Sequence, residues 1–444
     1  MTDTIFALSS GQGVAGVAVV RLSGPKSADA LQQLTQRAAP TPRRASLRTL
    51  RRADDGAQLD DALVLLFPAP ASFTGEDVVE LHLHGGRATV RAVLDALADL
   101  GLRAAEAGEF TRRAFQNGQL DLAQVEGLGD LLSAQTERQR LQALGQMTGA
   151  LGRRAEAWRG RLTEALGLMA AAIDFPDEED APDIVSDAVA ALLEDLEREL
   201  ETELAASTRG ALVRDGYQVA ILGPPNAGKS SLLNAFARRD VAIVSPEAGA
   251  TRDVVEATLE LSGCPVVIAD TAGLRVVEAA SAEAEGVRRA KARADAASLR
   301  LWVEETNGAR AVEAPAPSAE DWRVINKVDE GDRGCGPTED WTFAVSAKTG
   351  AGLSALLAAI KGRVADALGG EPPAMSRARH RQELGVALEA LRRAGARLKV
   401  LGGAEPELAA EDIRLATLAL SRLVGAVDVE DVLGHVFASF CIGK

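Results

Sequence analysis

The spacing of apolar residues changes along the chain and predicts a different structure in each part. Near the N-terminus, the runs "VAGVAVVRLSG", "DALVLLF" and "VVELHLHGG" are strand-like, and the last alternates with a period of two before it breaks at Gly85 and Gly86. The segment "TVRAVLDALADLG" has helical spacing and ends at Gly101. Strands mixed with a helix predict an α+β domain over residues 1–118.

Helical spacing begins at Gln119 and continues to about Phe175. An apolar stripe then repeats every three or four residues, at Val189, Leu192, Leu193, Leu196, Leu200 and Leu204. The same spacing returns near the C-terminus, at Leu384, Leu388 and Leu391. We therefore predict a discontinuous all-α domain, made of residues 119–215 and 371–444.

Between these helical parts lies an α/β stretch from Tyr217 to about Leu368, bounded by the turn-forming segments "STRGALVRDG" and "LGGEPP". We predict an inserted α/β domain over residues 216–370. A chain of 444 residues is long enough for about three domains, so the predicted fold class is multidomain, α/β plus all-α.

Composition sets limits rather than a function. With 49 basic and 64 acidic residues the net charge is −15, so a nucleic acid would have to be bound locally or together with another protein. Three cysteines cannot form a disulfide framework, the N-terminus has no signal-peptide pattern, and no run of about 18 apolar residues exists. These features predict a cytoplasmic protein without a membrane partner.

The segment "GPPNAGKS" (Gly223 to Ser230) fits the phosphate-loop pattern G-x-x-x-x-G-K-[ST] between the predicted strand "YQVAIL" and the predicted helix "SLLNAFA". Its glycines let backbone N–H groups turn toward phosphate, and the helix N-terminus adds partial positive charge. Lys229 is expected to reach the β- and γ-phosphates, and Ser230 is expected to bind Mg²⁺. A simple glycine turn is the alternative.

Two further segments fit the phosphate side of a nucleotide site. Asp270 opens "DTAG" directly after the apolar strand "PVVIA", where its carboxylate can hold Mg²⁺ through water and the Gly273 N–H can contact the γ-phosphate. Thr251, in "GATRD", lies between the two motifs and can complete the magnesium shell.

Two segments fit the base. "NKVD" (Asn326 to Asp329) follows the predicted strand "WRVI", and Asp329 can accept two hydrogen bonds from guanine that adenine cannot supply. "SAK" (Ser346 to Lys348) adds a backbone contact to the guanine oxygen. The order and spacing of all these motifs predict guanine-nucleotide binding.

The second switch lacks a usual catalytic group. Ras-like proteins orient the attacking water with a glutamine after DTAG and often use an arginine finger, but Leu274 stands at that position here. The amide oxygen of Asn226 could bind a monovalent cation that replaces the finger's charge. Glu283, in "EAASAEAEG", could orient the water; a solvated loop carboxylate is the alternative.

These segments together resemble the MnmE (TrmE) family of tRNA-modification GTPases. The resemblance rests on "GPPNAGKSSLLNA" and "DTAGLR", on "SFTGEDVVELHLHGG" and "GEFTRRAFQNGQLDLAQVEGLGDLLSAQT", and on the tail "LVGAVDVEDVLGHVFASFCIGK". It covers nearly the whole chain. It implies an N-terminal α+β folate-binding-like and dimerisation domain, a discontinuous helical domain and an inserted Ras-like P-loop G domain.

The resemblance also implies an activity. The family binds 5-formyltetrahydrofolate or a related one-carbon tetrahydrofolate, forms a homodimer, and hydrolyses GTP to GDP when two G domains meet across K⁺. With the FAD protein MnmG, in a heterotetramer, it adds an aminomethyl or carboxymethylaminomethyl group to C5 of the wobble uridine of certain tRNAs. The sequence leaves open which tRNAs are modified and which amine donor is used.

Carried over to this chain, the resemblance implies roles for individual residues. The implied K⁺ ligands are Asn226, Ser245, Glu247 and Ala250, and the Mg²⁺ ligands are Ser230 and Thr251. The other implied nucleotide contacts are Ala227, Gly228, Lys229, Ser231, Asp270, Thr271, Ala272, Gly273, Asn326, Lys327, Asp329, Ser346, Ala347 and Lys348. The implied folate contacts are Arg21, Glu80, Gln119 and Lys444, and the implied catalytic residues are Glu283 and Cys441.

The chain departs from the family pattern at three places. Ala250 replaces a usual threonine, although its carbonyl can still bind a cation, and Gln119 replaces a usual lysine, which weakens that folate contact. The second switch is one residue longer than usual, so Glu285 competes with Glu283 for the catalytic role.

The C-terminal "CIGK" raises two interpretations of Cys441. A prenylation box would end in a different residue and have an aliphatic residue before it, so Lys444 and Gly443 fit poorly. The family resemblance favours a functional cysteine, since a thiol suits nucleophilic chemistry where its pKa is lowered.

Other features favour structural roles. His82 and His84 alternate on one predicted strand, where a lining role is favoured over metal binding. The five arginines of "PRRASLRTLRR" could contact tRNA phosphates or form a solvated hairpin, and "DFPDEED" is an acidic turn. The remaining aromatic prediction is that four tryptophans lie in the core: Trp158, Trp302, Trp322 and Trp341.

Two rival functions are also compatible with a guanine-nucleotide site. A ribosome-assembly or signalling GTPase would be a switch without modification chemistry, and a ribosome-assembly GTPase predicts a basic RNA-binding domain after the G domain, where this chain has an acidic helical tail. A non-hydrolysing scaffold would bind guanine nucleotide and use its helices for docking. GTP turnover in potassium and in sodium separates the scaffold from the first interpretation.

Overall fold

The computed structural model describes most of the chain. The described ranges are 3–11, 13–174, 181–239, 241–243, 256–270, 294–306, 321–330, 334–338, 341–399, 406–427, 436–437, 440 and 442–443; of 172–174 and 181–186 only the backbone is described.

The chain folds as two compact units, each made of segments that are distant in the sequence. The first contains residues 1–129, 146–193 and 389–444, and the second contains residues 130–145 and 194–388. The helices after residue 119 contribute to both units.

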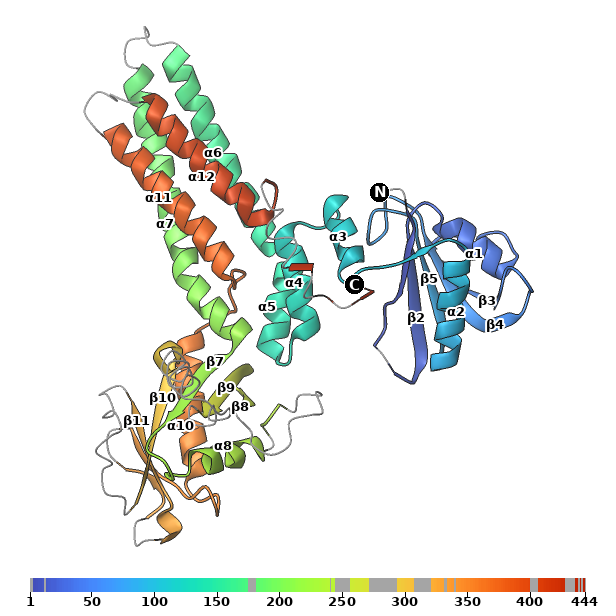
Figure 1. Cartoon of the computed structure of the whole chain (residues 1–444). Helices are drawn as coiled ribbons and strands as arrows, with labels where there is room; N and C mark the ends of the chain where they lie inside the picture. Colours follow the sequence, from blue (N-terminus) through green and yellow to red (C-terminus); the bar gives the residue numbers. More distant parts are fainter. Residues whose placement is uncertain are drawn as a thin grey trace, which may run out of the picture. The chain divides into compact units, whose positions relative to one another are not determined.

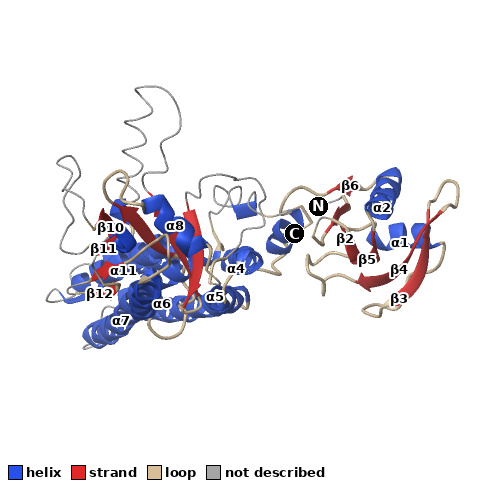
Figure 2. Ribbon diagram, turned by 90° about the horizontal axis from the view of Figure 1, so that it is seen from below, coloured by secondary structure: helices blue, strands red, loops and turns tan. Residues whose placement is uncertain are grey.

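A mixed sheet forms the N-terminal part of the first unit. Among the described residues its strand order is β3-β4-β5-β2-β1-β6. The strands are β1 (Ile5–Leu8), β2 (Ala15–Ser23), β3 (Ser46–Arg51), β4 (Gln58–Phe67), β5 (Val78–Gly85) and β6 (Arg103–Ala104). The helices α1 (Ser27–Thr35) and α2 (Arg87–Asp99) pack against it (Figure 2).

Alternation along these strands produces the core of the sheet. Val20 and Leu22 of β2 and Leu81 of β5 are completely buried against Leu31 of α1 and Leu97 of α2. The strands predicted from "VAGVAVVRLSG", "DALVLLF" and "VVELHLHGG" and the helix predicted from "TVRAVLDALADLG" are confirmed.

Helices complete the first unit. They are α3 (Glu109–Gln116), α4 (Leu122–Ser133) as far as Gly129, α6 (Ala150–Asp174), the first part of α7 (Ala181–Asp215), the last part of α11 (Ala378–Lys399) and α12 (Pro406–Val424). Helices α6 and α12 lie side by side (Figure 1). Arg393 and Arg397 of α11 both donate to the nearly buried carboxylate of Asp412 on α12, at 2.9 Å each.

A second mixed sheet forms the centre of the second unit. Its order among the described residues is β12-β13-β11-β10-β7-β9-β8. The strands are β7 (Tyr217–Leu222), β8 (Glu256–Leu261), β9 (Cys264–Asp270), β10 (Leu299–Glu305), β11 (Trp322–Asn326), β12 (Gly336–Pro337) and β13 (Thr342–Ala344). Its complete helices are α8 (Lys229–Ala237), α10 (Leu353–Leu368) and the short 3₁₀ helix η1 (Val328–Glu330). It also contains α5 (Glu137–Met147) as far as Gly145, the end of α4, the last part of α7 and the first part of α11.

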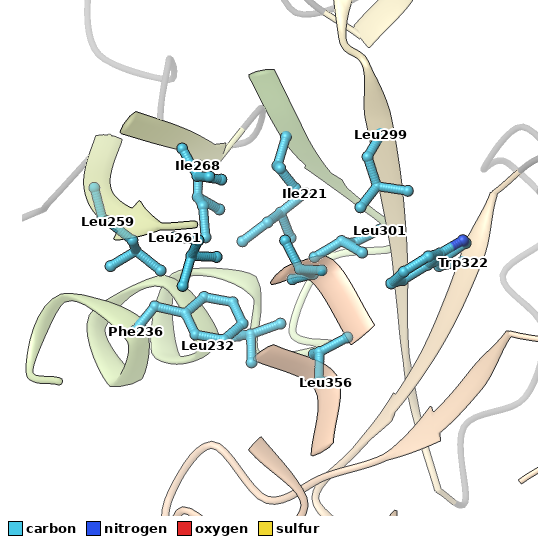
Figure 3. Packing of buried hydrophobic residues seen from close by; sticks show 14 of the residues in the cluster. Ile221, Leu232, Phe236, Leu259, Leu261, Ile268, Leu299, Leu301, Trp322 and Leu356 are labelled. Carbon is cyan, nitrogen blue, oxygen red and sulfur yellow. The ribbon is translucent and has the colours of Figure 1, made fainter. Parts of the chain in front are cut away.

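The core of this unit explains why the α/β pattern of residues 217–368 folds as one body. Figure 3 shows Phe236 of α8 and Leu356 of α10 packed with Ile221 and Ile268 of the sheet, and all four side chains are fully buried. The predicted strands "YQVAIL", "PVVIA" and "WRVI" and the predicted helix "SLLNAFA" are confirmed. The predicted class is confirmed in coarse form as two mixed sheets plus helices.

The tryptophan prediction is correct for three residues and wrong for one. Trp158, Trp302 and Trp322 are buried, whereas Trp341 is 61% exposed. Trp341 stacks on Trp322 with a ring-centroid distance of 4.9 Å, so it covers a core residue with one face and leaves its other side in solvent. Sequence spacing does not distinguish a residue in the core from one that lies over its edge.

Within the part of the chain that the structure describes, no helix is both long enough and apolar enough to cross a bilayer.

Candidate functional site

The phosphate loop between β7 and α8 is shaped by close backbone approach. Gly223 and Gly228 have φ angles of 136° and 87°, in the region that side chains disfavour. A Cβ at Gly223 would lie 2.1 Å from the Val303 carbonyl oxygen, and one at Gly228 would lie 2.2 Å from Nδ2 of Asn326. The two glycines are therefore required by the geometry of this loop.

Lys229 begins α8 and points back over the loop. Its Nζ donates to the carbonyl oxygens of Gly223 at 3.0 Å and of Pro224 at 2.8 Å, and the residue is 7% exposed. The ammonium group thus lies within the loop, where a phosphate group can replace the carbonyl oxygens as its partner.

Two oxygen-bearing side chains meet beside the loop. Ser230 Oγ donates to Oδ2 of Asp270 at 2.6 Å. Asp270 is the last residue of β9 and pairs in register with Ile221 near the end of β7, so the carboxyl ends of neighbouring parallel strands bring the two motifs together. A hydroxyl and a carboxylate are hard oxygen ligands suited to Mg²⁺.

Asn326 connects three segments of the nucleotide site. It is 1% exposed, its Nδ2 donates to the Ala227 carbonyl at 3.0 Å, and its Oδ1 accepts from the Ala347 N–H at 3.0 Å. The phosphate loop, "NKVD" and "SAK" are therefore joined through one side chain.

Asp329 lies beside this junction with an exposed carboxylate. Ser346 Oγ donates to its Oδ1 at 2.5 Å, and this hydrogen bond lowers the pKa of the Asp329 carboxyl. The carboxylate is therefore ionised and oriented, as an acceptor for two guanine N–H groups must be.

Several predicted site residues lie outside the described ranges. They are Ser245, Glu247, Ala250, Thr251, Thr271, Ala272, Gly273, Leu274, Glu283, Glu285, Cys441 and Lys444, and the acidic segment "DFPDEED" is outside them except for the backbone of Asp174. Of the described residues in the prediction, the structure brings together those from Asn226 to Ser230, Asp270, Asn326, Asp329 and the segment Ser346–Ala347.

A second group of predicted residues lies on the N-terminal sheet. Arg21 of β2 and Glu80 of β5 face each other in register, and the guanidinium donates twice to Glu80 Oε1, at 2.8 and 3.1 Å. Both side chains are 18% exposed. The guanidinium carbon lies 5.4 Å from the Phe73 ring centre and 5.9 Å from that of Phe110. The phenylalanines were not predicted, although both lie in the quoted motifs "SFTGED" and "GEFTRR".

The C-terminal segment lies beside the same strands. Ile442 forms a bridge with Ala107, and Ser9 Oγ donates to the Gly443 carbonyl at 2.9 Å. A Cβ on Gly443 would lie 2.2 Å from the Leu8 carbonyl oxygen. Since Leu8 ends β1, which pairs with β2 next to Arg21, the tail lies against the strand pair that carries this arginine.

Gln119 also belongs to this neighbourhood. Its Cγ and Nε2 lie 3.2 Å from the position of a Cβ on Gly75, and Asn117 Nδ2 donates to the Thr74 carbonyl at 2.7 Å. The loop that carries Phe73 therefore contacts Gln119. The role of Gln119 as a folate contact stays a prediction.

A buried charge network holds that loop, and it was not predicted. Arg113 and Glu109 of α3 are each 1% exposed and pair at 3.0 Å, while Arg113 also donates to Glu76 and to Asp3, at 3.1 and 2.8 Å. Burial opposes ionisation of Glu109, but hydrogen bonds from Arg103, the Glu106 backbone and Arg113 prevail and lower its pKa. The network ties α3 to the residues that follow Phe73.

The two strand histidines have other partners. His82 Nε2 lies 3.3 Å from Glu80, and His84 Nδ1 lies 2.7 Å from Asp60. Within the described residues, no group of three or more histidine, cysteine or acidic side chains has a metal-binding arrangement.

The convergence of a phosphate loop, the Ser230–Asp270 pair, "NKVD" and "SAK" at one edge of a mixed sheet defines a P-loop protein that binds guanine nucleotide. Models of the GTP-binding protein TrmE N-terminus and of the MnmE helical domain match residues 4–119 and 122–441. The chain belongs to the MnmE family of tRNA modification GTPases.

Full-length relatives support this assignment. Proteins described as tRNA modification GTPase MnmE from Parvibaculum lavamentivorans and Caulobacter vibrioides are 54% and 52% identical, and in both cases all of this chain and all of the relative are covered. The G domain of the T. maritima iron transporter FeoB matches 34% of this chain and 97% of that chain at 19% identity, but its TM-score of 0.22 supports no argument.

Proposed function

We propose that this protein is a potassium-dependent GTPase that works with an FAD-containing partner in tRNA modification. Its products are GDP and phosphate, and the modification adds an aminomethyl or carboxymethylaminomethyl group to C5 of a wobble uridine. The proposed organisation is an N-terminal domain at 1–118, a helical domain at 119–215 and 371–444, and a Ras-like G domain at 216–370.

The observation that carries the nucleotide part is the position of Asn326 between the phosphate loop and "SAK". It supports a site in which Lys229 reaches the phosphates, while Asp329 accepts from the base. Because the acceptor carboxylate cannot pair with adenine in the same way, the site favours guanine nucleotides.

Mg²⁺ fits beside Ser230 and Asp270, whose oxygens lie 2.6 Å apart. In this proposal Ser230 and Thr251 would hold the ion, and the Asp270 carboxylate would support it. When bound, the ion would supply positive charge at the phosphate groups. The oxygen donors suit a hard divalent cation.

The proposed potassium site uses Asn226 in the phosphate loop with carbonyls of Ser245, Glu247 and Ala250. Asn226 has a φ of 67°, so its backbone turns at the point where the loop surrounds the phosphates. The bound cation contributes the positive charge that an arginine finger supplies in other GTPases. Glu283 then orients the attacking water, with Glu285 as the alternative.

The folate part rests on the Arg21–Glu80 pair, whose guanidinium lies near the Phe73 and Phe110 rings, and on the adjacent C-terminal segment. A guanidinium and a carboxylate offer complementary hydrogen bonds to a pterin-like heterocycle. Gln119 and Lys444 complete the proposed contacts, and Cys441 lies in the tail that would approach the one-carbon unit.

A homodimer joined through the N-terminal domain, an MnmG-like partner and tRNA complete the proposal. The acidic net charge of −15 is consistent with a partner that shares the nucleic acid. The test is mass spectrometry of wobble uridines after deletion of the gene: loss of the C5 modification supports the proposal, and an unchanged tRNA population contradicts it.

The cation dependence has a separate test. GTP turnover should be fast in potassium and slow in sodium, and Asn226→Ala should remove this difference while GDP still binds. Strong potassium stimulation of the variant would contradict the role of Asn226. Negligible turnover of the unmodified protein in both salts would favour the scaffold interpretation.

A further inference from the structure

Glu305 and Thr306, the last two residues described in the β10 segment, contact the "NKVD" loop. Glu305 ends β10 and pairs in register with Asn326, the last residue of β11. The Glu305 carboxylate forms an ion pair with Nζ of Lys327, the second residue of "NKVD". Thr306 donates to the Asn326 carbonyl twice, from its N–H at 3.1 Å and from Oγ1 at 2.9 Å.

These contacts hold a backbone that would not adopt its conformation freely. Lys327 has a φ of 62°, in the left-handed region that residues other than glycine rarely occupy. The preceding Asn326 is fixed from two directions, because its side chain joins Ala227 to Ala347 and its carbonyl accepts from Thr306. Glu305 restrains the side chain of Lys327, the residue after Asn326.

The ion pair with Glu305 restricts the motion of the Lys327 side chain. A lysine has a long, flexible stem and a strongly hydrated ammonium group, so it samples many positions in solvent. The Lys327 and Glu305 side chains are each about one-third exposed, at 33% and 34%. The hydrogen bond to Glu305 also raises the pKa of Lys327 above its ordinary value.

We propose that Glu305 and Thr306 are positioning residues that hold the "NKVD" loop ready for guanine and thereby slow the release of bound nucleotide. Both residues act through Asn326 and Lys327 rather than by contact with the base. A loop that is already ordered loses less conformational entropy when the ligand binds, so the complex is longer-lived. This inference rests on the proposed nucleotide-binding function.

The first test compares two glutamate variants on the same strand. Glu305→Gln should release a fluorescent GDP analogue about two- to fivefold faster at low salt, the range for a partly exposed ion pair. Glu304→Gln is the matched control, because Glu304 pairs with Arg323 at 2.6 Å, and its release rate should equal that of the unmodified protein. Equal rates for both variants would overturn the inference.

The second test asks whether the effect passes through Lys327. The difference between the unmodified protein and Glu305→Gln should vanish near 1 M salt, where charges are screened within about 3 Å. In a Lys327→Met background, Glu305→Gln should have no further effect. A salt-independent effect, or one that persists fully in that background, would refute the ion-pair explanation.

Thr306 allows a third test that does not depend on the ion pair between Glu305 and Lys327. Thr306→Val removes the hydroxyl donor and should speed release, whereas Thr306→Ser keeps it and should restore slow release. Thermal unfolding of each variant checks that the fold is unchanged. If the unmodified protein binds no GDP, the proposed function fails; if it binds GDP and neither Glu305→Gln nor Thr306→Val speeds release, only this inference fails.

Discussion

Gly228 shows how a single missing side chain permits the nucleotide site to form. A methyl group there would lie 2.2 Å from Asn326 Nδ2, the atom that donates to the Ala227 carbonyl. The residue also has a positive φ of 87°, which costs an L-residue roughly 1–2 kcal/mol. Its substitution therefore strains the loop and displaces the side chain that joins the phosphate and base motifs.

We expect Gly228→Ala to weaken GDP binding by at least about tenfold, since strain of about 1.4 kcal/mol alone corresponds to that factor. Titration calorimetry with GDP measures the change. Gly362→Ala is the control, because Gly362 lies in α10 of the same unit with open space around its Cβ position. Similar GDP affinities for both variants would contradict the role assigned to Gly228.

At the scale of elements, the buried network on α3 connects this helix to the loop that carries Phe73 and Glu76. Arg113 contacts three carboxylates, and the most buried of them, that of Glu109, has almost no access to solvent. Removal of one partner from a buried ion pair leaves an uncompensated charge, which is the costly case. Arg112 of α3 pairs with Glu106, which precedes the helix, at 3.1 Å, and these side chains are much less buried, at 33% and 67% exposed.

Arg113→Met should therefore lower the free energy of unfolding of the first unit by about 3 kcal/mol. Arg112→Met should lower it by less than about 1 kcal/mol, as for exposed ion pairs. Urea unfolding followed by circular dichroism distinguishes the two. The idea fails if Arg113→Met and Arg112→Met are equally stable.

The same network predicts a pH dependence. The pKa of Glu109 in the folded protein lies below its ordinary value of 4.5, so the carboxylate stabilises the fold fully above that pH. This contribution is lost as the pH falls through the lower, folded-state pKa. Urea unfolding between pH 3 and pH 7 should show a smaller acid-induced loss of stability in Glu109→Gln than in the unmodified protein; identical pH profiles would exclude Glu109 as a source.

At the scale of the whole molecule, the two ends of the chain form one local structure. Ser9 and Gly443 are 434 positions apart and share a hydrogen bond of 2.9 Å, and Gly443 approaches the Leu8 carbonyl with a φ of 96°. The nucleotide motifs belong to the other compact unit. A change in the tail should therefore affect the N-terminal site and spare the nucleotide site.

Gly443→Ala should weaken binding of 5-formyltetrahydrofolate by about tenfold or more, because the methyl group displaces the tail from β1. GDP affinity should stay unchanged. Equilibrium dialysis with both ligands measures this. Gly56→Ala is the control, since Gly56 has a φ of 70° and open space around it, so it carries the strain without the collision. Unchanged folate binding in Gly443→Ala would remove the tail from the proposed site.

Much of the fold and the nucleotide site was predictable from the sequence. Alternation in "VVELHLHGG" and the phosphate-loop pattern are local, since strand geometry and the glycine turn each depend on a few adjacent residues. The prediction that Trp341 is buried was wrong, because the residues next to it in the sequence do not determine which side chains pack against it in the folded protein.

The sequence by itself determined the elements, the guanine-nucleotide motifs and the family resemblance, because each is written in short segments whose spacing constrains the backbone. Only the tertiary structure decided which distant groups meet: Arg113 with three carboxylates, Glu305 with Lys327, and Ser9 with Gly443. Such contacts depend on how strands and helices pack. A local sequence pattern does not determine this packing, because the same pattern is compatible with many different partners elsewhere in the chain.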